Sequence, residues 1–127
     1  MASSIEPIID PVFECLYIAF EGDTWDAFKL TILGSGVPVD LRSATARCQF
    51  KSQIHDTAAL LTITQGSGIT LGNGRPNISI ALTPEQTKTL GEGTFYFDVE
   101  ITSEGVTKTR ASCTLELKQS VTQPATI

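Results

Sequence analysis

The chain has 127 residues, of which 41% are hydrophobic and 18% are charged. This length predicts one domain with enough apolar side chains to build a core without disulfides or a metal. The formal net charge is −5 and the sequence has no cluster of lysine or arginine, which argues against binding to nucleic acid or to anionic membranes.

The first eleven residues are predicted to form an extended arm, because Pro7 and Pro11 oppose a helix. Two interpretations are open: the arm lies along the edge of its own domain, or it docks on a neighbouring subunit by adding to a sheet edge. We favour the second. The sequence starts without the basic and apolar regions of a signal peptide and has no apolar run of about 20 residues, so we expect a protein assembled inside a cell.

Residues 12–20 form the first predicted strand, and both of its faces are apolar. A strand of this kind is either central in a sheet or lies at an interface. The arm and this strand supply our candidate interface residues, which are Ile5, Ile8, Ile9, Val12, Phe13 and Tyr17.

Further strands are predicted over residues 25–32, 44–52, 59–64, 69–71, 78–82, 95–102 and 106–118. One short helix is predicted at about residues 84–90, between the strands at 78–82 and 95–102. Thr83 is a suitable N-cap, Pro84 fits the first helical position, and Gln86 completes a capping box. Gly91 and Gly93 then end the helix.

These elements predict an all-β fold, an immunoglobulin-like β-sandwich of about seven or eight antiparallel strands with one short helix and an extended N-terminal arm. The domain boundaries are expected at 1–11 for the arm, 12–118 for the sandwich and 119–127 for a C-terminal tail. The order Cys-Trp-Cys of antibody domains is absent, because Trp25 precedes both Cys48 and Cys113.

The three cysteines, Cys15, Cys48 and Cys113, all lie in predicted strands. An odd number in a chain without export signals favours reduced, buried thiols. A disulfide between Cys48 and Cys113 across the sandwich is the minority alternative.

The sequence shows no motif that predicts catalysis, a metal or a cofactor. His55 and Asp56 are adjacent in a predicted loop, and no nucleophile on a recognisable turn accompanies them. Glu21, Asp23 and Asp26 cluster at a turn but lack the spacing of a calcium loop. We therefore expect no enzyme, no cofactor and no small-molecule substrate.

Seven short motifs follow one another along the chain: Gly22–Thr24, Gly36–Leu41, Ala44–Arg47, Gly68–Leu71, Leu82–Thr87, Gly93–Glu100 and Val106–Thr107. In this order they resemble the motifs of small β-sandwich proteins of tailed bacteriophages, including the N-terminal domain of baseplate upper proteins. The similarity spans about residues 22–117, with two departures: residues 25–27 lengthen the first strand of the pattern, and the extension at residues 1–19 is long.

The resemblance implies a virion structural protein without an active site, assembled in the host cytoplasm. Its partners would be other virion structural proteins in a symmetric, multi-copy assembly. The leading hypothesis is an adaptor or fibre-linking subunit of the tail or baseplate, and the second is a decoration (cement) protein of the capsid. A third is a carbohydrate-binding module, which would need exposed aromatic side chains from among Tyr17, Trp25 and Tyr96.

Overall fold

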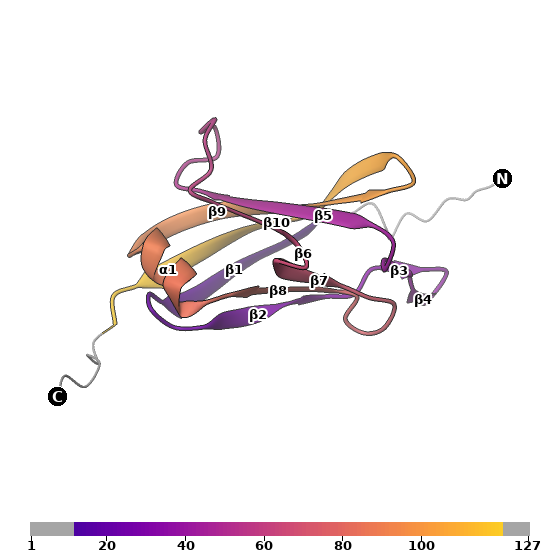
Figure 1. Ribbon diagram of the computed structural model, residues 1–127, viewed down its shortest axis with the longest axis horizontal. Coiled ribbons are helices and arrows are strands. Elements are labelled where there is room, and N and C mark those ends of the chain that lie inside the picture. Colours follow the sequence, from indigo (N-terminus) through magenta and orange to yellow (C-terminus); the bar gives the residue numbers. More distant parts are fainter. Residues whose placement is uncertain (1–11, 121–127) are drawn as a thin grey trace.

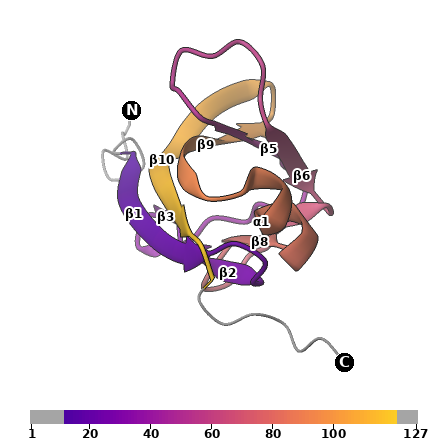
Figure 2. The same ribbon diagram turned by 90° about the vertical axis from the view of Figure 1, so that its left-hand side faces the viewer.

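The computed structural model describes residues 12–120. Its main element is an eight-stranded sheet that curls round until it is nearly a barrel (Figure 1, Figure 2). The strand order is β1-β10-β9-β5-β6-β7-β8-β2, so β1 and β2 are the two edges of the sheet. The prediction of an all-β fold with one short helix is confirmed. The predicted arm and most of the predicted tail lie outside the described residues.

The bounds of the elements follow in chain order. They are β1 (Phe13–Phe20), β2 (Trp25–Leu30), β3 (Leu33–Gly34), β4 (Val37–Pro38), β5 (Thr45–Lys51), β6 (Leu61–Gln65), β7 (Gly68–Leu71), β8 (Ile78–Leu82), α1 (Pro84–Leu90), β9 (Gly93–Ser103) and β10 (Val106–Lys118). Among the described strands, the short β3 and β4 pair only with each other and form a small separate hairpin.

Two of the strand pairs are parallel, which differs from the predicted all-antiparallel sandwich. The first strand, β1, runs parallel to the last strand, β10, with Phe13 opposite Ala111 and Phe20 opposite Lys118. The second parallel pair is β6 and β7, which are separated along the chain by two residues, Gly66 and Ser67. Gly68, the first residue of β7, has a φ of 105°. A Cβ atom at this glycine would lie 3.1 Å from the Ile63 Cβ, so both the backbone angle and the close approach favour glycine here.

The helix α1 lies across one end of the curled sheet, as Figure 2 shows. It begins with the predicted capping box. The Gln86 backbone N–H donates to Thr83 Oγ1 at 3.1 Å, and the Thr83 N–H donates to Gln86 Oε1 at 2.9 Å. Further along the helix, buried Thr87 ties it to the β1–β2 turn: its hydroxyl donates to the Asp23 carbonyl at 2.8 Å and accepts from the Gly22 N–H at 3.0 Å.

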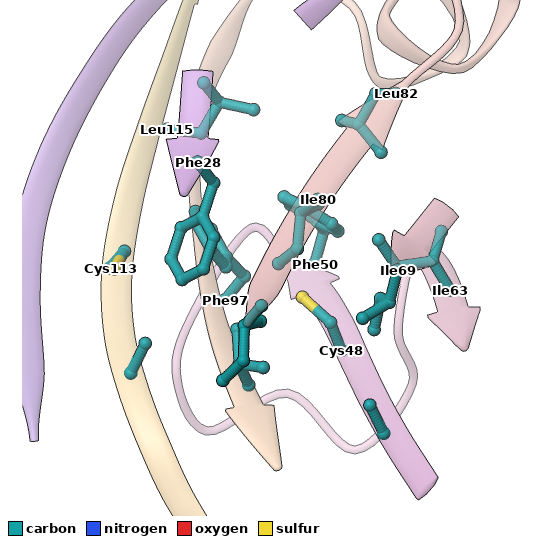
Figure 3. Close-up of a cluster of buried hydrophobic side chains, with 14 of the residues drawn as sticks. Phe28, Cys48, Phe50, Ile63, Ile69, Ile80, Leu82, Phe97, Cys113 and Leu115 are labelled. Atoms are coloured by element: carbon teal, nitrogen blue, oxygen red, sulfur yellow. The ribbon is translucent and has the colours of Figure 1, made fainter. Parts of the chain in front are cut away.

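The core fills the space enclosed by the sheet, and aromatic rings occupy its centre. Phe97 on β9 lies 4.7 Å from the ring of Phe50, 5.9 Å from Trp25 and 6.1 Å from Phe28, measured between ring centroids. Figure 3 shows Phe28 and Ile80, from the layer of β2 and β8, pointing toward Phe97 and Phe50 in the layer of β9 and β5. In β5 and β10 the apolar residues of the alternating pattern are the buried ones, so the sequence predicted the inward face of both strands correctly.

Candidate protein-interaction surface

The outward side of β1 is apolar and faces solvent. Leu16, Ile18 and Phe20 are 57%, 56% and 41% exposed, and we call these three side chains the β1 outer face. They alternate with Phe13, Tyr17 and Ala19, which pack against the core. The described core lies on the inner side of the sheet only, so β1 buries one of its two apolar faces and leaves the other uncovered.

The sequence left two possibilities for β1, a central strand or a strand at an interface. The central position is wrong within this chain, because β1 is an edge of the sheet and pairs only with β10 among the described strands. Edge strands are commonly protected by charged residues, proline or a bulge. The other edge, β2, has such protection: its register shifts between Trp25 and Phe28, and exposed Asp26 and Lys29 lie on it. Within β1 the only charged residue is Glu14.

The candidate interface residues predicted from the sequence fall into three groups. Ile5, Ile8 and Ile9 lie outside the described residues. Val12 is 39% exposed, just before β1. Phe13 and Tyr17 point to the inner side, where the Phe13 ring lies 6.0 Å from Phe28 and the Tyr17 ring lies 5.2 Å from Trp25.

The β1 outer face was not among the predicted interface residues. Its three members alternate with Phe13 and Tyr17, so the period-2 pattern placed them together on one face. What the pattern could not provide was the choice of which face is buried. That choice depends on the pairing of β1 with β10, at the opposite end of the chain.

A second surface feature is a groove of about 340 Å³ on the outer side of β5, β9 and β10. In its floor Asp98 of β9 lies opposite Gln49 of β5, and Tyr96 lies opposite Lys51. Exposed Ile54, from the loop after β5, is also among the lining residues. The groove is mostly polar, and its aromatic lining residues are Tyr96 and Phe97, of which Phe97 is buried in the core.

Two contacts involve residues that line this groove. Lys51 Nζ donates to the Asp56 carbonyl at 2.8 Å and so ties the loop after β5 to that strand. On the floor, the Arg47 guanidinium donates to Glu100 Oε1 at 3.4 Å, and both side chains are substantially exposed. An exposed pair of this kind contributes little to stability, so both charged groups can exchange partners with a bound molecule.

The adjacent His55 and Asp56 do not form an oriented pair in the described hydrogen bonds. The Asp56 carboxylate instead accepts from Ser52 Oγ at 3.1 Å and from the Gln53 N–H at 3.2 Å, as a cap of its own loop. Over residues 12–120, the side chains of His, Cys, Asp and Glu form no group of three that could hold a metal ion. The turn with Glu21, Asp23 and Asp26 is included in this range.

The three cysteines are free thiols, and they differ in exposure. Cys48 and Cys113 are buried as predicted, whereas the prediction of burial is wrong for Cys15, which is exposed on the edge strand. Burial raises the pKa of the Cys48 thiol well above its usual value of 9.0. Burial is also the largest cause that raises the pKa of Cys113 to about 11.

The three aromatic side chains considered for carbohydrate binding also differ in where they lie. Trp25 is buried, with 4% exposed, and Tyr17 packs on the core, where burial is the largest cause that raises its pKa to about 12. Tyr96 alone among the three lines the outer groove. In the part of the chain that the structure describes, the single helix has seven residues and is far too short to cross a membrane.

Two comparisons with known proteins bear on identity. A scan of the chain against models of protein families and a search of curated proteins both find no match, so the functional proposal depends on the fold and on the surfaces described above.

Proposed function

We propose that this protein is a structural subunit of a bacteriophage particle, most simply an adaptor or fibre-linking subunit of the tail or baseplate. It acts through protein–protein contacts, in several copies within a symmetric assembly, and has no catalytic role. The observation that carries the proposal is the β1 outer face, an exposed apolar row on an edge strand that has little protection.

The physical reason is the cost of leaving this strand uncovered. Burial of apolar surface stabilises by about 25 cal/mol per Å², so Leu16, Ile18 and Phe20 forgo this stabilisation while they face water. An edge strand without protection also presents N–H and C=O groups to any other strand and so promotes aggregation. A partner that covers β1 removes both costs, and a subunit that is permanently assembled always has one.

The order of the sequence motifs supports the choice of a phage particle over other assemblies, since it resembles β-sandwich proteins of tailed phages. The capsid decoration protein is the alternative location, and it would use the same contacts. Fold alone does not distinguish the two locations.

A second candidate function is carbohydrate binding at the outer groove. The observation that favours it is that Tyr96 lines the same groove as the planar polar groups of Gln49, Arg47 and Asp98. Such groups suit the hydroxyls of a sugar, and the ring suits its apolar face. A glycan array with the purified protein tests this function. Binding that is lost in Tyr96→Ala supports it, and an array without signals above background contradicts it.

Gold-labelled antibody on intact, purified particles tests the leading proposal. We expect label at the tail tip or baseplate, at symmetric positions. Label over the head would establish the capsid alternative, and particles that contain none of the protein by mass spectrometry would contradict both.

A further inference from the structure

We infer that β1 binds β1 of a second copy of this chain, antiparallel and about a two-fold axis centred on Tyr17, so that the two sheets continue into each other. This inference names the partner of the surface in the proposed function and rests on that function in treating β1 as an interface. The interface needs only two copies of the chain.

The first step is that the two edge strands differ in how well they are protected against pairing with another strand. On β2 a register shift and the exposed charges of Asp26 and Lys29 oppose pairing with a strand of another molecule. On β1 eight residues run in unbroken register with β10, and the outward side chains after Glu14 are all apolar. Only β1 therefore presents a regular edge that a strand of equal length can extend.

The second step is the match of a two-fold axis to the side-chain pattern. With the axis at Tyr17, Leu16 of one copy lies opposite Ile18 of the other, and the contact occurs twice. Four apolar side chains then form one continuous row across the new strand pair. Each of them is more than half exposed in the single chain.

The third step is charge complementarity, which selects this register. On the outer side of the sheet Phe20 lies beside Lys118 of β10. In the proposed register Glu14 of one copy lies opposite Phe20 of the second copy, with Lys118 of that copy one strand further on. Strands are spaced by about 4.8 Å, so the two charged residues are about 10 Å apart at their Cα atoms, within reach of two long side chains.

The neighbouring registers fit less well. An axis at Leu16 places Glu14 opposite Ile18 of the second copy, which lies beside Glu116, so like charges approach each other. An axis at Ile18 carries Glu14 beyond the end of the opposing strand. The register centred on Tyr17 is thus the one that brings opposite charges together at both ends of the apolar row.

A contact made by one pair of strands is smaller than the roughly 800 Å² per partner of a standard interface. We therefore expect a reversible dimer with a dissociation constant in the micromolar range, measurable by sedimentation velocity with the full-length protein over a wide range of concentrations. A protein that remains monomeric at the highest concentration, or that forms a closed trimer, would overturn the inference.

A charge swap tests the register. Within one chain Glu14 and Lys118 are about six residues apart along the strands, or about 20 Å, so any coupling between them arises across two copies. We expect Glu14→Lys and Lys118→Glu each to weaken the dimer about tenfold, and the double variant to return to within about threefold of the original dissociation constant. Lys88→Glu, the same charge change on exposed α1, is the matched control and should leave it unchanged.

The proposed pairing would be overturned if neither single substitution changed the dissociation constant of the dimer. It would also be overturned if the double variant did not recover the original dissociation constant. Hydrogen exchange on the unaltered protein provides an independent measurement. We expect amides of β1 to become more protected as the concentration rises while those of β2 do not, and equal behaviour of the two edges would count against the inference.

The outcome can be separated from that of the proposed function. A monomer that is nevertheless present on phage particles would overturn the two-fold pairing alone. A dimer that is absent from particles would overturn the phage proposal alone.

Discussion

Asn77 and the backbone of Ile32 exchange two hydrogen bonds. The Ile32 N–H donates to Asn77 Oδ1 at 2.8 Å, and Asn77 Nδ2 donates back to the Ile32 carbonyl at 2.9 Å. The same amide nitrogen also donates to the Val39 carbonyl at 2.9 Å. A single buried side chain thus joins the chain on both sides of the small β3–β4 hairpin to the start of β8.

We predict that Asn77→Ala lowers the free energy of unfolding by about 3 kcal/mol, because it leaves the buried Ile32 N–H and the partly buried Val39 carbonyl without their partner. Urea denaturation followed by the fluorescence of Trp25, the one tryptophan, measures this change. Asn73→Ala on the exposed part of the same loop is the control, with an expected change within about 0.5 kcal/mol. Equal midpoints for the two variants would disprove the role of Asn77.

The hydroxyl of Thr87 provides a second test of the structure. Thr87→Val keeps the shape of the side chain but removes the bonds to the Gly22 N–H and the Asp23 carbonyl. We expect a loss of about 1 kcal/mol in the free energy of unfolding, since both bonds are partly buried and water can reach the two backbone groups in part. Thr89→Val, at an exposed position of the same helix, should change it by less than about 0.5 kcal/mol. If both variants unfold at the same urea concentration, Thr87 does not hold the turn to the helix.

Thiol labelling tests the distribution of the cysteines. In the native protein we expect one maleimide adduct, at exposed Cys15, because Cys48 and Cys113 are buried and their raised pKa values keep them protonated. Intact mass should show one adduct before unfolding and three in guanidinium chloride. Cys15→Ser should give no adduct in the native state, and rapid labelling at a second cysteine would refute the structure of the core.

Alkaline pH should destabilise the fold. The pKa of Cys113 rises from its usual 9.0 to about 11 in the folded protein, and that of Cys48 rises as well. The unfolded chain therefore releases these protons at lower pH than the folded chain, so the free energy of unfolding falls as pH rises above the unfolded value.

Urea midpoints measured between pH 7 and 10 check this sign. We expect nearly constant midpoints below about pH 8 and a steady decline above about pH 9, where thiols of the unfolded chain ionise. Cys113→Ala should show a shallower decline than the unaltered protein, relative to its own midpoint at pH 7. Stability that increases between pH 9 and 10 would contradict the assignment of both buried thiols.

Local patterns explain what could be predicted from the sequence. The helix at 84–90 follows from Thr83, Pro84 and Gln86, whose capping roles depend only on residues within one turn. The inward faces of β5 and β10 follow from the alternation of apolar and polar residues, which requires only that one face of the strand is exposed to solvent.

The remainder depends on contacts between distant parts of the chain. The position of β1 at the edge results from parallel pairing with β10, and no local pattern encodes that choice of neighbour. Because both faces of β1 are apolar, alternation could not decide whether Tyr17 or Ile18 points to the core. Asn77 lies in an Asn-Ile-Ser sequence that matches a glycosylation acceptor, yet its amide is buried and occupied by backbone partners, which only the packed loop reveals.

The most direct measurement of the central claim, that β1 is an assembly surface, compares particles formed with the unaltered protein and with the double variant Leu16→Lys and Ile18→Lys. Both side chains face solvent, so we predict that the variant unfolds within about 1 kcal/mol of the unaltered protein, yet is missing from purified particles by quantitative mass spectrometry. Asp26→Lys with Ala27→Lys, two exposed changes on β2, should be incorporated normally. Incorporation of the β1 variant at the level of the unaltered protein would contradict the claim.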